Sequence, residues 1–392
     1  MEYVWLRLRL TPAWTLGGRR AESRRGPREG VGAGEQASRR GAPGTDVASG
    51  RWPSRPPSCS AGYSDTPSAA SIGPFRQSLK TSFFTYQAEF MGSTPAAGAN
   101  LRAALSYCVQ QVHNYDYHHY LCLLHLPPSM RKAAFAFRAL NVETAKAMDV
   151  VSDPKTGLMR LLWWKDVIDK IFANKLVEHP VAQVLSSVVS ERKISKHWLK
   201  RSVEARINDA NQDDYAIPET VSELERYAED TQSTILYMTL QAGGIQSTIA
   251  DHAASHIGKA SGLLLLLKAL PHHVSKQGRI PYIPASIAED CGLLTREGGR
   301  SEVRMGDELP DAVFKVASVA DAHLEKAREL ASSVPTEAIP VLLPGVPAQV
   351  LMDSLRSREF NVFDSRLARG VHGISPLWYQ IKLNWHAWQK KY

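Results

Sequence analysis

The segment Asp251–Pro284 constrains the fold of this chain more than any other part of its sequence. Its first half spaces apolar residues at three- and four-residue steps, which places them on one face of a helix. The run Leu263–Leu267 is apolar on every side, so we expect this helix to be central and surrounded by other helices. Pro271 is expected to end the helix, because proline cannot donate the helical hydrogen bond. A basic, glycine-containing loop follows.

Beyond residue 100 the chain is patterned as a series of further helices. Helical spacing of apolar residues, together with capping residues and prolines, predicts them over residues 101–112, 116–124, 129–148, 156–172, 181–189, 195–207, 220–240, 310–330, 347–360 and 375–392. Residues 292–307 are predicted to be a loop, and strand-like alternation does not persist beyond a few residues. We therefore predict an all-α fold, a single helical bundle of about ten helices that covers residues 96–392.

The first 95 residues differ in composition from the rest. Residues 1–90 hold 13 Lys/Arg against 7 Asp/Glu, and eleven arginines come before residue 60, whereas the first lysine is Lys80. A segment rich in Arg, Gly and Pro cannot bury enough apolar surface to fold, so residues 1–95 are predicted to be a disordered leader. An arginine-rich start without lysine is typical of mitochondrial transit peptides. The alternative is an extension upstream of an internal start at Met91.

Charge and cysteine content exclude several classes of protein. Beyond residue 90, 34 Lys/Arg stand against 32 Asp/Glu, so the predicted helical domain is nearly neutral and no nucleic-acid partner is expected. The four cysteines are scattered and lack the CxxC spacing of zinc and redox sites, which favours a reducing compartment. A run of about 18 apolar residues is missing, and no transmembrane span is predicted.

The central segment resembles the second signature of the squalene/phytoene synthase family, a Gly- and Ala-rich helix followed by a G-R-x-Y-x-P loop. The matching residues are Gly258, Ala260, Gly278, Arg279, Tyr282 and Pro284. The stretch FAFRALNVETA, within the predicted helix 129–148, is similar to the family's first signature, in which an aromatic residue and an arginine lead into D-x-x-x-D. The resemblance covers roughly residues 100–290 and implies an isoprenoid-synthase-like helical bundle.

The aspartates of both signatures are missing. On the family pattern they fall at Asn141 and Ala145 in the first signature and at Ala269 and His273 in the second. The family's aspartates hold Mg²⁺, which requires oxygen ligands that alanine lacks and that the neutral asparagine supplies poorly. Histidine prefers softer metals. The resemblance therefore implies a degenerate site with no catalytic, metal-binding or cofactor-binding residues, and no cofactor.

Two other carboxylates have the spacing of a metal site. Asp149 and Asp153 are four residues apart, but they lie two helical turns beyond the family positions. Pro154 follows directly and disfavours helical backbone at Asp153. We interpret both carboxylates as solvated residues at a helix end.

Two pairs of histidines also lie close together in the sequence. His252 and His256 are four residues apart, but a zinc peptidase site needs H-E-x-x-H and a third ligand, and position 253 is alanine. One of these histidines is expected to face solvent and the other to form a hydrogen bond within the bundle. The neighbours His118 and His119 lie between tyrosines and have no metal-ligand context in the sequence.

The C-terminal helix carries an apolar stripe. The stripe consists of Ile374, Leu377, Trp378, Ile381, Trp385 and Trp388. Residues 365–392 contain five Lys/Arg and no acidic side chain, so this helix has the composition of an amphipathic segment that rests on an anionic membrane. The alternative, which we favour, is that it forms the last helix of the bundle with the stripe packed inward.

Within the family, the transit-type leader, the kept bundle, the degenerate aspartate motifs and the run DHAASHIGKA resemble the branch that assists the assembly of mitochondrial respiratory complex I (NADH:ubiquinone oxidoreductase). That resemblance implies a non-catalytic role early in assembly, on the matrix side of the inner membrane and peripheral to it. The implied partners are complex I subunits or other assembly factors, held by the outer surface or by a hydrophobic groove. The candidate groove residues are Phe135, Leu140, Tyr237 and Leu264. Two alternatives stay open, a lipid- or isoprenoid-binding carrier and an active prenyl-diphosphate transferase with displaced metal ligands.

Overall fold

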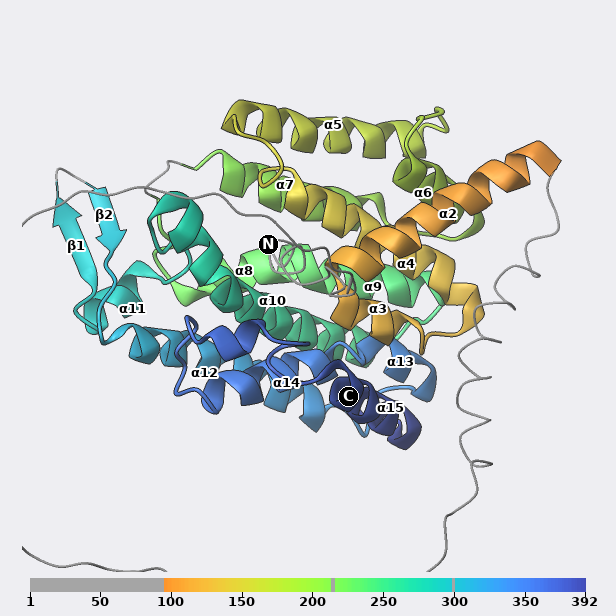
Figure 1. Cartoon of the computed structure of the whole chain (residues 1–392). Coiled ribbons are helices and arrows are strands. Elements are labelled where there is room, and N and C mark those ends of the chain that lie inside the picture. Colours follow the sequence, from red (N-terminus) through yellow and green to blue (C-terminus); the bar gives the residue numbers. More distant parts are fainter. Residues whose placement is uncertain (1–94, 213–215, 298–299) are drawn as a thin grey trace, which may run out of the picture. The chain divides into compact units, whose positions relative to one another are not determined.

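The computed structural model describes residues 95–212, 216–297 and 300–392 (Figure 1). The first part contains α2 (Pro95–Tyr115), α3 (Tyr117–Leu123), α4 (Pro128–Lys146), α5 (Pro154–Phe172), α6 (Pro180–Glu191) and α7 (Lys196–Ala210). Next come α8 (Val221–Ala228), the π-helix η2 (Glu229–Ser233), α9 (Thr234–Ala242), α10 (Thr248–Gln277) and α11 (Ala285–Asp290). The last part contains β1 (Leu294–Glu297), β2 (Arg300–Val303), α12 (Leu309–Glu329), η3 (Thr336–Ala338), α13 (Ile339–Leu342), α14 (Gly345–Arg356), η4 (Ser365–Ala368) and α15 (Pro376–Gln389). The predicted all-α fold is confirmed.

The predicted leader lies outside the described residues, apart from Pro95, the first residue of α2. The division of the chain into a leader and a helical domain at residue 95 therefore stays a prediction. Of the residues that the structure describes, no single helix is long and apolar enough to cross a bilayer. One bent pair of short helices, Thr336–Leu342 and Gly345–Arg356, has sufficient length and composition, and Val341, Leu342 and Leu351 from this pair are buried among other helices.

Helix α10 is the centre of the bundle, as its sequence predicts. It packs against α8, η2, α9, α12 and α14, and it runs through the middle of the helices in Figure 1. Leu263, Leu264 and Leu267 are completely buried, and Leu266 is nearly so. An apolar run without a polar face is stable in this position because every side of the helix meets a neighbour.

Pro271 does not end α10, contrary to the prediction. The helix continues to Gln277 and ends at Gly278, whose backbone is left-handed with φ of 72°. The amide of Gly278 donates to the carbonyl of Val274 at 2.9 Å. Proline removes one amide donor from the ladder, but the hydrogen bonds of the residues after it hold the last turns in helical form.

The predicted helix 220–240 is divided by η2, and the predicted loop 292–307 contains a hairpin. η2 lies against α10, where a Cβ added to Gly258 would lie 2.5 Å from the Cα of Ser233. Glycine is required at this contact because the two backbones approach too closely for any side chain. In the hairpin, Leu294 pairs with Val303 in an antiparallel ladder too short to show as alternation in the sequence.

Helix α15 is oriented opposite to the prediction that we favoured. Its buried residues are Tyr379 and Leu383, whereas five members of the predicted inward stripe are exposed. Those five are Leu377, Trp378, Ile381, Trp385 and Trp388. The stripe has helical spacing in either orientation, so periodicity alone does not determine which face meets the bundle.

Candidate functional site

The main cavity of the described domain has a volume of about 670 Å³. Its wall includes Arg138, Asn141, Thr144 and Ala145 from α4, Arg206 and Asp209 from α7, and Gly262, Leu265, Leu266, His273 and Lys276 from α10. The segment 148–154 and the loop 279–282 complete much of the rest. The loop after α10 carries the family-like G-R-x-Y-x-P sequence, and the segment after α4 follows the first signature. Both segments therefore line the same cavity.

Three of the four degenerate family positions lie at this cavity. Asn141, Ala145 and His273 line it, whereas Ala269 is buried on α10 and is not among the lining residues. The ring of His273 packs edge-on against Tyr282, at 5.1 Å between centroids. The fold thus brings together parts of two signatures that are more than one hundred residues apart in the sequence, as the family resemblance implies.

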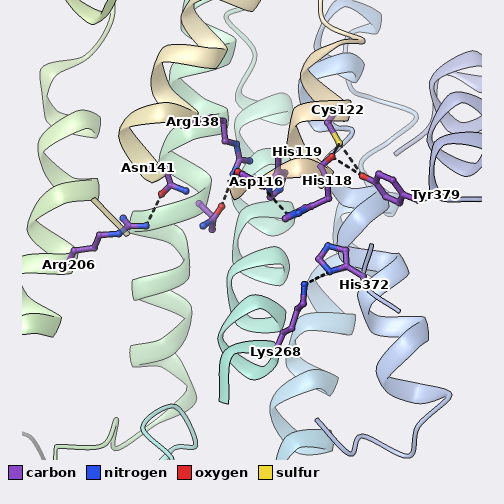
Figure 2. Close-up of polar contacts among 11 residues, drawn as sticks. Asp116, His118, His119, Cys122, Arg138, Asn141, Arg206, Lys268, His372 and Tyr379 are labelled. Atoms are coloured by element: carbon purple, nitrogen blue, oxygen red, sulfur yellow. Dashed lines mark hydrogen bonds and ion pairs between the residues drawn. The ribbon is translucent and has the colours of Figure 1, made fainter. Parts of the chain in front are cut away.

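A fixed guanidinium is hydrogen-bonded to the first of these positions. Nη2 of Arg206 donates to Oδ1 of Asn141 at 2.7 Å (Figure 2). Nη1 of Arg206 donates to the carbonyl of Ser202 at 3.2 Å. Both side chains are buried. The guanidinium of Arg206 therefore binds the side-chain oxygen of Asn141. In the family pattern this position is an aspartate whose oxygen binds a metal ion.

Charges of both signs line the cavity in equal numbers. Among the described lining residues the cations are Arg138, Arg206, Lys276 and Arg279, and the carboxylates are Asp116, Asp149, Asp209 and Glu302. Buried charges are stable only when they are paired or hydrogen-bonded. The cavity wall therefore combines charged side chains with apolar surface, whereas a purely hydrophobic groove was expected from the sequence.

Asp116 is the centre of a polar network at one end of the cavity. Its Oδ1 lies 2.7 Å from Nδ1 of His119, and its Oδ2 lies 3.6 Å from Nη1 of Arg138. The same arginine atom donates to Oε1 of Gln232 at 3.0 Å. Burial, together with the charge of Arg138, holds the pKa of His119 well below its usual value. His119 is therefore neutral, and Arg138 is the cation that balances Asp116.

The side chains of Asp116, His118 and His119 place three ligand-type atoms within 4.8 Å of one another. This grouping is not visible in the sequence, where His118 and His119 have no metal-ligand context. Arg138 already pairs with Asp116, and Nζ of Lys268 lies 3.1 Å from Nδ1 of His372. The His372 ring packs edge-on against that of His118, at 4.5 Å between centroids. Two fixed cations beside the cluster disfavour a metal ion there, so we interpret it as an internal polar network.

Asp209 and Tyr282 form a second polar contact in the cavity wall. Burial raises the pKa of Asp209 to about 6, and it does so against the opposing effects of Arg206, of the hydrogen bond from Tyr282 and of Arg279. The Tyr282 hydroxyl lies 3.5 Å from Oδ2 of Asp209, and burial raises the pKa of this tyrosine well above its usual value. Asp209 is not among the predicted site residues, because the predicted helix ends at residue 207, before this position. In the structure α7 continues to Ala210 and points Asp209 at the cavity.

The two carboxylates that we interpreted as solvated have different positions. Asp149 lines the cavity and its side chain is only 14% exposed, so that interpretation is wrong for this residue. Its Oδ1 lies 3.4 Å from Nζ of Lys276 and 3.6 Å from Nε2 of His272. Asp153 is exposed and caps α5 by accepting from the amide of Lys155 at 3.1 Å, as expected of a residue at a helix end.

The remaining candidates lie in the core. Phe135, Leu140, Tyr237 and Leu264 are buried and are not among the residues that line the cavity. His252 is exposed, and His256 contacts His323 at 2.8 Å between their Nδ1 atoms. The expectation that one of this pair faces solvent while the other hydrogen-bonds within the bundle is confirmed.

Comparison with known proteins agrees with this arrangement. Residues 112–371 match the model of the squalene/phytoene synthase family. NADH dehydrogenase (ubiquinone) complex I, assembly factor 6 from Bos taurus is 37% identical over 303 residues, which are 77% of this chain and 87% of that protein. The protein of the same name from Homo sapiens is 35% identical over 297 residues, 76% of this chain and 86% of that one.

Two solved structures share the fold. A dehydrosqualene synthase, solved with a ligand, has a TM-score of 0.60 at 16% identity and covers 75% of this chain and 99% of its own. A squalene synthase from Alicyclobacillus acidocaldarius has a TM-score of 0.57 at 17% identity and covers 70% of this chain and 99% of its own. The bundle predicted from two degenerate signatures is confirmed, and the chain belongs to the squalene/phytoene synthase family.

Proposed function

We propose that this chain is a non-catalytic assembly factor for mitochondrial respiratory complex I, NADH:ubiquinone oxidoreductase, and that it acts early in assembly. The observation that carries the proposal is the similarity to proteins named complex I assembly factor 6, at 37% and 35% identity over about three quarters of the chain. The proposed partners are complex I subunits or other assembly factors. The proposed location is the matrix side of the mitochondrial inner membrane, in peripheral contact with it.

The cavity supports the loss of catalysis. Ala145 has no side-chain oxygen, and the amide oxygen of Asn141 is already bonded to Arg206. Release of a diphosphate leaving group requires a metal or another cation that neutralises the developing charge. A Mg²⁺ ion near Asn141 would lie close to the Arg206 guanidinium without a carboxylate at Ala145 to hold it, so its binding there is unfavourable.

A second candidate function, an active prenyl-diphosphate transferase with displaced ligands, is favoured by one observation. Asp149 and Asp209 are not at the family positions, yet both line the cavity. Against it, Asp149 is paired with Lys276, and Asp209 interacts with the cations Arg206 and Arg279. Diphosphate release from prenyl diphosphates by the purified chain with Mg²⁺ would support this candidate, and no release is expected.

A lipid- or isoprenoid-binding carrier is the third candidate. Leu161, Leu265 and Leu266 contribute apolar surface to a cavity of about 670 Å³, although charged residues also line it. Extraction of the purified chain with organic solvent, followed by mass spectrometry, separates the possibilities. A stoichiometric lipid supports the carrier, whereas the assembly proposal expects the chain to bind protein with no lipid retained.

The direct test is removal of the protein from cells, followed by native electrophoresis of the respiratory complexes. We expect complex I to be lost while the other respiratory complexes are retained, and we expect the full chain to restore it. A variant with a filled cavity, Ala145→Phe, shows whether the cavity takes part in restoration. Normal complex I in cells that lack the protein would contradict the proposal.

A further inference from the structure

Helix α15 is anchored to the bundle by one face only. Tyr379 is completely buried, and its hydroxyl donates to the carbonyl of His118 at 2.9 Å. Leu383, one turn later, is also buried. Beyond the helix, the hydroxyl of Tyr392 donates to the carbonyl of Ala327 at 3.0 Å. The helix is therefore held in a fixed orientation at both ends, beside α14 (Figure 1).

The opposite face of α15 forms an exposed aromatic ridge. The ridge comprises Leu377, Trp378, Ile381, Trp385 and Trp388, with exposed fractions of 68%, 59%, 49%, 55% and 74%. Trp385 and Trp388 contact each other, at 5.3 Å between ring centroids. Single exposed apolar residues are common on proteins, but five large ones on one stripe of a short helix form a contiguous patch, and such patches mark interaction sites.

Lysines lie beside the ridge. Residues 365–392 contain five Lys/Arg and no Asp/Glu, and one of the five, Arg366, is paired with Asp364 just before this segment. Lys390 and Lys391 are exposed where α15 ends. Lys382 lies on the same helix and pairs with Asp353 of α14 at 3.3 Å, so the carboxylate that reaches this helix is already neutralised. An occupant of the ridge therefore meets indole rings and lysines together.

We propose that the aromatic ridge lies on an anionic phospholipid bilayer, with the axis of α15 in the plane of the membrane. Tryptophan combines a large apolar ring with an N–H donor and is enriched at the depth of lipid head groups. Lysines beside such a stripe attract anionic lipids. The helix has 14 residues and is about 21 Å long, too short to span a bilayer but long enough to rest on one. The inference rests on the proposed membrane location and assigns that contact to a surface.

The test uses the full chain and two kinds of vesicle, one of phosphatidylcholine alone and one that also contains phosphatidylglycerol. Partitioning is measured by flotation, and we expect it to be much stronger on the anionic vesicles. The triple variant Trp378→Ser, Trp385→Ser, Trp388→Ser is expected to reduce partitioning by about tenfold or more. Replacing Lys390 and Lys391 by glutamine is expected to reduce binding to anionic vesicles by about fivefold for each lysine and to leave neutral vesicles unaffected.

A matched control alters exposed apolar residues elsewhere. Met159 and Leu176 are 64% and 85% exposed and lie outside α15, so the double variant Met159→Ser, Leu176→Ser is expected to partition like the unaltered chain. Lipids brominated in the acyl chains are expected to quench tryptophan emission of the unaltered chain and to lose most of this effect in the triple variant. Equal loss of partitioning in the control variant would overturn the assignment to the ridge.

Three further outcomes would overturn the proposal. These are a full chain that fails to partition, a triple variant that partitions unchanged, and a concentration-dependent dimer that the triple variant abolishes. If the three ridge tryptophans were protected from aqueous iodide in the absence of vesicles, the ridge would be covered by another part of the chain. That result would also overturn the proposal. The loss of complex I in cells that lack the protein is a separate readout, so failure of vesicle binding is distinguishable from failure of the proposed assembly role.

Discussion

In most proteins apolar side chains lie inside and charged side chains lie outside, and both the cavity and the C-terminal helix depart from this distribution. The cavity gathers charged side chains inside the bundle, whereas α15 presents tryptophans to solvent. Inside, the charges described above are balanced, as Arg138 with Asp116 and Lys276 with Asp149 illustrate. Outside, the exposed rings of α15 contribute little to folding. The paired charges at the cavity are thus compatible with a stable fold. The exposed tryptophans of α15 are explained only by a binding partner.

The largest expected effect concerns the buried charge pair. Arg138→Met would leave Asp116 buried without its cation, and we expect the free energy of unfolding to fall by about 3 kcal/mol or more. Unfolding in urea, followed by circular dichroism, measures this change. Trp385→Ser on the exposed ridge is the matched control. Equal stability of Arg138→Met and Trp385→Ser would show that the buried charge pair contributes no more to folding than an exposed ridge residue does.

A smaller effect is expected where α10 meets η2. An added Cβ at Gly258 lies within 2.5 Å of Ser233 backbone atoms, so Gly258→Ala should lower the free energy of unfolding by about 2 kcal/mol. Gly345→Ala provides the comparison, because its added Cβ meets nothing closer than 3.5 Å. A loss that is the same for both variants would show that the close approach at Gly258 has no energetic consequence.

The buried carboxyl of Asp209 predicts a pH dependence. Its pKa is about 6 in the folded protein and near 4 in an unfolded chain, so the folded state binds more protons between these values. Stability is therefore expected to fall as pH rises through this window, with a loss of about 3 kcal/mol that is complete above about pH 7. Asp209→Asn should remove that loss, so its stability relative to the unaltered chain should rise between about pH 4 and 7.

The exposed carboxylate of Asp166 provides the control for this measurement. Its side chain is 57% exposed and pairs with Lys170 on the surface of α5. Asp166→Asn should change stability by less than about 0.5 kcal/mol, with little variation between about pH 5 and 7. A pH profile for Asp209→Asn that parallels this control would show that burial does not perturb Asp209.

The smallest effect on stability is expected at the ridge. Trp388→Ser should change the free energy of unfolding by less than about 0.5 kcal/mol, because 74% of this side chain is exposed. Leu383→Ala on the buried face of the same helix should cost about 2–3 kcal/mol, since it leaves a cavity. Thermal unfolding of both variants tests this contrast, and a large loss for Trp388→Ser would mean that the ridge is part of the core.

The sequence predicted those features that depend on local patterns. The central helix and the buried leucine run follow from spacing, and the isoprenoid-synthase-like bundle follows from the resemblance to the family. The sequence did not predict the orientation of α15, because an apolar stripe fits a core and a membrane equally well. Asp149 and Asp209 were also missed, since their burial depends on segments that meet only in the folded chain.

The proposed function requires that this chain keeps the synthase fold without synthase chemistry. The most direct test introduces the double variant Asp149→Asn, Asp209→Asn into cells that lack the protein and measures complex I by native electrophoresis. Both carboxylates line the cavity and lie away from the degenerate family positions. Full restoration of complex I by a variant that folds as the unaltered chain does is the predicted result. Failure of that folded variant, together with Mg²⁺-dependent diphosphate release by the unaltered chain alone, would contradict the claim.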